Sequence, residues 1–103
     1  MGRRRSRTLA RRIPRLSASF KRSLRRVGVV AGSARDRTVA AAIRSLVQTE
    51  VLPTPMDTIA AFGAGRAFVR RVPRENLWIW FQVADRHLEL LAVKDEPPVP
   101  LDE

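Results

Sequence analysis

Apolar residues recur at helical spacing through the first half of the chain, with charged residues between them. The first stripe consists of Leu16, Phe20, Leu24 and Val27. A repeat of three or four residues predicts an amphipathic helix. Ser17 or Ser19 can cap its start by accepting a hydrogen bond from a free backbone N–H, and Gly28 marks its end.

A second apolar stripe predicts another helix directly after the first. Its members are Val39, Ile43, Leu46 and Val47, and Val51 would extend it. Ser33 can cap the start, the alanine run at 40–42 favours helix, and Pro53 and Pro55 end it. Because the link between the two helices is short, they are expected to form a helical hairpin.

The second half of the chain has the pattern of strands. Predicted strands cover residues 67–72, 77–83 and 87–93, with a turn at 73–76 and a hairpin loop at 84–86. Residues 56–65 are expected to form a loop or one more helical turn. A short strand within residues 8–16 is confined to a sheet edge, because Pro14 has no N–H to donate.

Helices followed by strands predict an α+β fold: an N-terminal helical hairpin packed on one face of a small antiparallel sheet of three to four strands. Side chains alternate between the two faces of a strand. The face assigned to the helices carries Leu77, Ile79, Phe81 and Val83. The face that the helices leave open carries Trp78, Trp80 and Gln82.

Two tryptophans on an open face are consistent with three occupants. Nucleic-acid bases can stack on Trp78 and Trp80, flanked by arginines. The N-terminal arm or the Pro-rich tail can cover the rings within the chain. A partner protein can also cover them, because Trp and Arg are frequent interface anchors.

Composition adds a strong positive charge to this picture. The 103 residues suffice for one small domain, their formal net charge is +10, and eighteen of the twenty cationic residues are arginine. Arginine matches phosphate with two hydrogen bonds, so the expected partner is anionic, either RNA or the ribosome. The chain divides into a basic arm (1–12), an α+β domain (13–93) and a Pro-rich acidic tail (94–103).

Other features exclude whole classes of site. The chain has no cysteine, so disulfides and thiolate zinc sites are excluded, and no carboxylates are patterned around its single histidine. No metal and no cofactor are therefore expected. No apolar run approaches the roughly 18 residues that cross a membrane, and a cytoplasmic protein is expected. Residues 1–35, which contain no acid and many Arg and Ser, also fit a mitochondrial presequence, but the apolar pattern from Phe20 onward belongs to the fold.

Basic and aromatic residues supply the candidate site. The nucleic-acid-binding candidates are Arg22, Arg25, Arg26, Arg66, Arg70, Arg71, Arg74, Trp78 and Trp80. The arginines of the first helix also fit a solvated helix face. Arg70 and Arg71 lie within an apolar strand, so at least one of them must face the open side. His87 is the only imidazole available for proton transfer, and it also fits half-exposed polar surface at a strand end.

Three stretches, in this order and spacing, resemble the RelE/ParE superfamily of bacterial toxin–antitoxin toxins. Ser19-Phe-Lys-Arg-Ser-Leu-Arg-Arg26 is similar to the first helix of that family, and Val51-Leu-Pro53 is similar to the end of its second helix. Trp80-Phe-Gln-Val-Ala-Asp85, followed by Leu88-Glu-Leu-Leu-Ala-Val93, is similar to its last hairpin. The resemblance covers about residues 13–93.

The resemblance implies a toxin neutralised by an acidic antitoxin encoded beside it. In one branch of the family the toxin binds the ribosomal A site and cleaves mRNA, with cations stabilising the phosphate and a Tyr or His transferring the proton. On this pattern the phosphate would be bound by Arg66, Arg70 and Arg71. His87 would transfer the proton.

The chain also departs from the ribonuclease branch. Trp78 stands where a catalytic arginine is common, residues 94–100 replace a segment that often holds basic residues with a His or Tyr, and the chain has no tyrosine. The alternatives are a gyrase-inhibiting toxin, an inactive toxin relative, or a non-catalytic basic protein that binds nucleic acid or the ribosome.

Overall fold

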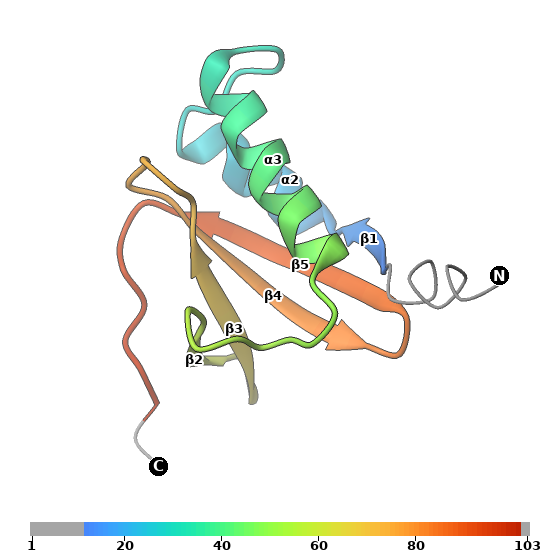
Figure 1. Cartoon of the computed structure of the whole chain (residues 1–103). Helices are drawn as coiled ribbons and strands as arrows, with labels where there is room; N and C mark the ends of the chain where they lie inside the picture. The colour runs from blue at the N-terminus through green and yellow to red at the C-terminus, as the bar shows by residue number, and fades with distance from the viewer. Residues whose placement is uncertain (1–11, 102–103) are drawn as a thin grey trace, which may run out of the picture.

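The computed structural model describes residues 12–101 and places two helices against one face of a sheet (Figure 1). The elements are β1 (Ile13–Leu16), α2 (Ala18–Arg26), α3 (Ala34–Gln48), β2 (Thr58–Phe62), β3 (Gly65–Arg71), β4 (Trp78–Ala84) and β5 (His87–Lys94). This confirms the α+β class and the helical hairpin, but the sheet has five strands rather than three or four. Apart from Arg12, the predicted basic arm lies outside the described residues.

The strands are ordered β1-β5-β4-β3-β2 across the sheet. Strands β2 to β5 pair antiparallel with their neighbours, whereas β1 runs parallel to β5 with Ile13 opposite His87. The short edge strand predicted around Pro14 is confirmed. The predicted antiparallel sheet is wrong for this pair, because two helices and three strands separate β1 from β5 along the chain and no hairpin imposes an antiparallel pairing.

Strand β2 is the element that the sequence pattern missed, because residues 56–65 were expected to be a loop or a helical turn. It pairs with β3 through a two-residue turn, in which Gly63 adopts φ +58°. Glycine adopts this angle without steric cost. Ala60 and Ala61 lie at the centre of β2, and alanine has little preference for strands, so the pairing with β3 decides the structure here.

Both helices begin at the predicted serines. Ser17 accepts a hydrogen bond from the N–H of Phe20, and Ser33 accepts one from the N–H of Asp36. Helix α3 ends at Gln48, so the expected extension to Val51 is wrong, and Val51 is exposed. Arg12 donates to the carbonyl oxygens of Thr49 and Glu50 just beyond this end, where free carbonyl groups favour a cation.

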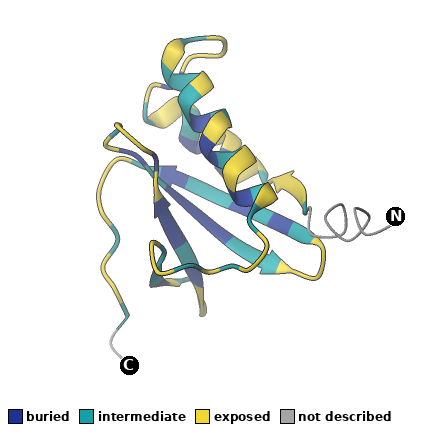
Figure 2. Cartoon of the chain, viewed as in Figure 1, coloured by how far each residue is buried: buried dark blue, intermediate teal, exposed yellow. Residues whose placement is uncertain are grey.

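The sheet separates two apolar clusters. Figure 2 shows that buried and intermediate residues run along its central strands. The larger cluster lies between the helices and the sheet and includes Phe20, Leu46, Leu77, Ile79 and Phe81. The smaller cluster lies on the other face and consists of Ala60, Ala67, Val69 and Trp80. The predicted division of β4 into a helix-facing set and an open set is thereby confirmed.

Three serines join α2 to β5 where β1 ends. A register shift between Trp80 and Phe81 marks an irregularity in the β4–β5 pairing. At the same level Ser19 donates to the carbonyl oxygen of Leu91 at 2.9 Å, with Ser17 at 3.4 Å from the same oxygen. The buried Ser23 hydroxyl accepts from the N–H of Val93 at 2.8 Å and donates to the carbonyl of Phe20. The serine hydroxyls therefore form hydrogen bonds with backbone groups of β5 that have no partner in a neighbouring strand.

Replacing Ser23 by alanine is expected to lower the free energy of unfolding by about 1–3 kcal/mol, because the N–H of Val93 would be buried without a partner. Urea denaturation would measure this change, and hydrogen exchange would show faster exchange at Val93. Ser45→Ala, at an exposed position on α3, is the matched control and should change stability by less than about 0.5 kcal/mol. Equal stability of the two variants would contradict a structural role for Ser23.

Candidate nucleic-acid interface

Two tryptophans and two cations gather at one end of the open sheet face. We call Arg71, Trp78, Trp80 and Lys94 the aromatic–cationic patch. Trp78 lies between Arg71 of β3 and Lys94 of β5 in the strand register. The guanidinium carbon of Arg71 lies 5.6 Å from the centroid of the Trp78 ring, and the Lys94 ammonium lies 4.2 Å from that of Trp80. Each cation therefore stands over an indole face, where the ring quadrupole attracts it.

The connection between β3 and β4 orients the Arg71 side chain. Its Nε donates to the backbone carbonyl of Glu75 at 3.0 Å, and its Nη2 donates to the side-chain oxygen of Asn76 at 3.2 Å. Arg71 is exposed and Trp78 is half-buried. In this arrangement the accessible Trp78 ring can stack on a base, and the exposed guanidinium of Arg71 can contact a phosphate.

Trp80 lies deeper than Trp78, under the C-terminal tail. Its residue is 7% exposed, and its ring packs against Phe62 with 6.1 Å between centroids. Trp80, Lys94 and the tail residues 96–99 line a hollow of about 270 Å³. The tail then reaches β2, where the N–H of Leu101 donates to the carbonyl of Ile59 at 2.8 Å. Three occupants of the open face were predicted, and over Trp80 the occupant is the C-terminal tail of the chain itself.

Arg70 does not belong to the open face. Its guanidinium donates to the carboxylate of Asp57, including one bond of 2.9 Å, and to the hydroxyl of Thr54 at 3.0 Å. The Arg70 side chain is 11% exposed and that of Asp57 is fully buried. Arg70 therefore lies on the helix side of the sheet, where its donors hold the segment before β2, and the structure does not bring it to Trp78 and Trp80.

The remaining predicted arginines are distributed over several surfaces. Arg22 and Arg25 are exposed on α2, in the layer opposite the open face. Arg26, at the end of α2, lines a hollow together with Lys94 and therefore lies beside the patch. Arg66 is exposed at the start of β3. The predicted set is thus only partly brought together.

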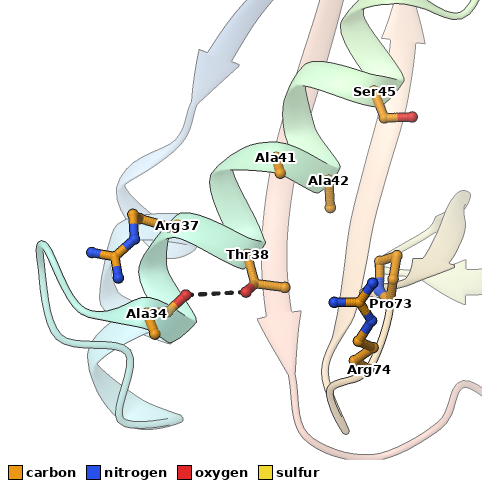
Figure 3. A pocket seen from close by; sticks show the side chains of 8 residues that line it. All are labelled: Ala34, Arg37, Thr38, Ala41, Ala42, Ser45, Pro73 and Arg74. Atoms are coloured by element: carbon orange, nitrogen blue, oxygen red, sulfur yellow. Dashed lines mark hydrogen bonds between the residues drawn. The ribbon is translucent and has the colours of Figure 1, made fainter.

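Arg74 lies in the connection between β3 and β4, on the helix side of the sheet. It shares a hollow of about 490 Å³ with Arg37 and small residues of α3 (Figure 3). Within this hollow the hydroxyl of Thr38 donates to the carbonyl of Ala34. Arg74 is therefore separated from Trp78 and Trp80 by the sheet itself.

His87 lies at the other end of β5, in a second polar cluster. Its Nε2 lies 3.1 Å from Nη2 of Arg15, and Nη1 of Arg15 lies 3.5 Å from a carboxylate oxygen of Glu89. A guanidinium can only donate, so Nε2 is the acceptor in this contact. His87 and Lys94 begin and end β5, a separation of about 20 Å at roughly 3.3 Å per residue. The structure therefore does not bring His87 to the patch.

Sequence reasoning missed Arg15, Glu89 and Lys94 as members of these clusters. Their grouping depends on the pairing of β1 with β5 and of β5 with β4. Strand alternation alone places Glu89 on the same face as His87, and this signal could have identified it. Arg15 joins them only through a parallel pairing that nothing in the local sequence specifies.

Within residues 12–101, no three His, Asp or Glu side chains are placed to hold a metal ion. Over the same residues, no helix is long and apolar enough to cross a membrane.

Comparison with solved structures finds a shared fold in a bacterial toxin. The crystal structure of a copper-bound mutant toxin from Helicobacter pylori aligns with a TM-score of 0.55 at 19% identity, covering 79% of this chain and 90% of that chain. The sequence matches no family profile and none of the curated proteins. At this identity the similarity shows a common fold.

Asp57→Ala is expected to lower the free energy of unfolding by about 3–5 kcal/mol, because it leaves the guanidinium of Arg70 buried without its counter-charge. Adding Arg70→Met should recover part of this loss, since the unpaired charge is then removed. Urea denaturation of the single and double variants measures both effects. Glu50→Ala, which removes an exposed carboxylate, is the control. An Asp57→Ala protein as stable as this control would show that the pair is dispensable.

Proposed function

We propose that this chain is the toxin of a type II toxin–antitoxin pair of the RelE/ParE kind, and that it binds RNA, free or on the ribosome, through the aromatic–cationic patch. The observation that carries the proposal is the position of two indole rings and two cations on the sheet face that the helices leave open. The fold shared with the Helicobacter pylori toxin supports it. An acidic antitoxin would complement the net charge of +10.

Single-stranded RNA is the nucleic acid that suits this patch. Unpaired bases can stack on aromatic side chains, and each stacked base contributes about 1–3 kcal/mol. Arg71 and Lys94 supply charge for the adjoining phosphates. A duplex hides its base faces and would gain only the phosphate contacts.

The proposed toxin acts by binding rather than by cutting at the patch. Cleavage through the ribose 2′-OH needs a proton acceptor within hydrogen-bond reach, about 3 Å. His87, the only imidazole of the chain, lies about 20 Å along β5 from Lys94. Arg71 and Lys94 can hold phosphate there, but no imidazole can reach it.

A second candidate is an endoribonuclease centred on His87. The observation that favours it is the contact between His87 and Arg15, which places an imidazole, a guanidinium and the Glu89 carboxylate together on the open face. The imidazole would accept the 2′-OH proton, and Arg15 would stabilise the phosphate. The two candidates use opposite ends of the sheet, so separate substitutions distinguish them.

Expression of the chain without a partner in a bacterium is expected to arrest growth. The variant Arg71→Ala/Lys94→Ala should relieve the arrest, because it removes both cations of the patch. The matched control Arg37→Ala/Arg44→Ala removes the same charge from exposed positions of α3 and should still arrest growth. Growth curves with immunoblots at equal expression measure this effect. Normal growth with soluble, folded parent protein would contradict the toxin proposal.

His87→Gln is expected to leave the growth arrest intact if binding through the patch is the activity. Mapping of RNA 5′ ends should then show the same ends with and without expression of the protein. A general base contributes about 10²–10⁴-fold to such a reaction. New mRNA ends that fall at least a hundredfold in His87→Gln would assign the activity to the second candidate.

A further inference from the structure

The indole N–H of Trp80 is a buried donor without a partner. Within residues 12–101, no hydrogen-bond acceptor reaches this Nε1 atom, although the residue is only 7% exposed. An unsatisfied buried donor costs about 1–3 kcal/mol, and most buried polar groups in proteins are paired. The ring that carries this donor also lines the hollow under the tail. An acceptor supplied from outside the chain would satisfy it.

The hollow indicates which chemistry such a ligand must have. Two donors belong to residues that line it: the Lys94 ammonium, and the Trp80 N–H, which is closed to solvent while the tail is in place. A ligand that carries carbonyl oxygens and a negative charge would use both donors. The volume of about 270 Å³ lies below the roughly 300–1,000 Å³ of sites for drug-sized ligands. It therefore suits a single ring system with an adjoining anion.

The tail that closes the hollow is weakly held. Its ordered pairing with the sheet consists of the N–H of Leu101 donating to Ile59 and a bridge between Pro100 and Ala60. Pro97, Pro98 and Pro100 have no N–H to add to this edge. The tail also brings Glu96 to the wall of the hollow, so a carboxylate occupies the region that an incoming phosphate would need.

On the basis of the proposed function, we propose that the hollow is a subsite for one unstacked base of single-stranded RNA, and that residues 95–101 are a removable cover that competes with it. When the cover lifts, the base enters beside the Trp80 ring and its carbonyl oxygen accepts from Nε1. The Lys94 ammonium leaves the ring face and contacts the adjoining phosphate. Departure of Glu96 removes a like charge from the phosphate.

Leu101→Pro tests the cover in the full-length chain, because it deletes the N–H that binds Ile59. Val99→Ala, at a residue that is 81% exposed, is the matched control in the tail. The probe is a short labelled oligouridylate, whose bases carry carbonyl oxygens, beside an abasic oligomer of the same length. Apparent affinity is reduced by the fraction of molecules in the competent state. If that fraction is about a tenth, Leu101→Pro should bind oligouridylate up to about tenfold more tightly than the parent or Val99→Ala.

Two further measurements tie the gain to the subsite. In a ¹H–¹⁵N spectrum the indole signal of Trp80, assigned with Trp80→Phe, should move when oligouridylate is added and stay in place with the abasic oligomer. Adding Lys94→Met to Leu101→Pro keeps the aliphatic cover of the ring and should remove most of the gain in affinity. This variant preserves the test if Trp80→Phe fails to fold.

The outcomes separate this proposal from the proposed function. Equal binding of oligouridylate by parent and Leu101→Pro, with an unmoved Trp80 signal, overturns the subsite and leaves RNA binding by the rest of the patch intact. Absence of RNA binding in every variant overturns both proposals. A gain in Leu101→Pro that is as large for polyglutamate or for the abasic oligomer also overturns the base subsite, and a gain for polyglutamate would assign the hollow to an acidic protein partner.

Discussion

Strand β5 must pair its backbone on both sides, and the way it does so positions the rest of the molecule. Strand β4 satisfies one side along its length, whereas β1 satisfies the other side only as far as Leu90. Beyond that point the hydroxyls of Ser19 and Ser23 replace a strand. Because these serines belong to α2, the helix must lie against the end of β5. The hairpin therefore covers one face of the sheet and leaves the other face to the aromatic–cationic patch.

The same side chain, arginine, has different roles on the two sides of this sheet. On the helix side, Arg70 binds Asp57 and Arg35 binds Glu75 while also donating to the carbonyl of Val27. These guanidinium groups connect loops to the framework and are already neutralised. On the open side, Arg71 stands over an indole ring with no carboxylate among its hydrogen-bond partners there. The net charge of the chain is thus no measure of its binding surface.

The sequence was sufficient for features that depend on local pattern. Serine caps, helical stripes and the alternation of β4 all follow from neighbouring residues, and each was predicted. Features that depend on pairing between segments distant in the sequence were not predicted. Strand β2 forms because Thr58–Phe62 pairs with β3. Arg70 is directed to the helix side, where it forms an ion pair with the buried carboxylate of Asp57. Strand alternation places Arg70 and Arg71 on opposite faces, but no local rule says which of the two faces the helices.

The register of the sheet also restricts what the molecule can do chemically. Rotation of a side chain moves its end by a few ångströms, whereas Lys94 and His87 are separated by the whole length of β5. Because both residues belong to one extended strand, only loss of that extended conformation would bring the imidazole to Lys94. In a cutting activity centred on His87, the cation in contact with the imidazole is Arg15, and this side chain also contacts Glu89. Binding can begin at Arg71 and Trp78, which are already accessible and already in contact, as soon as they meet a strand with unpaired bases.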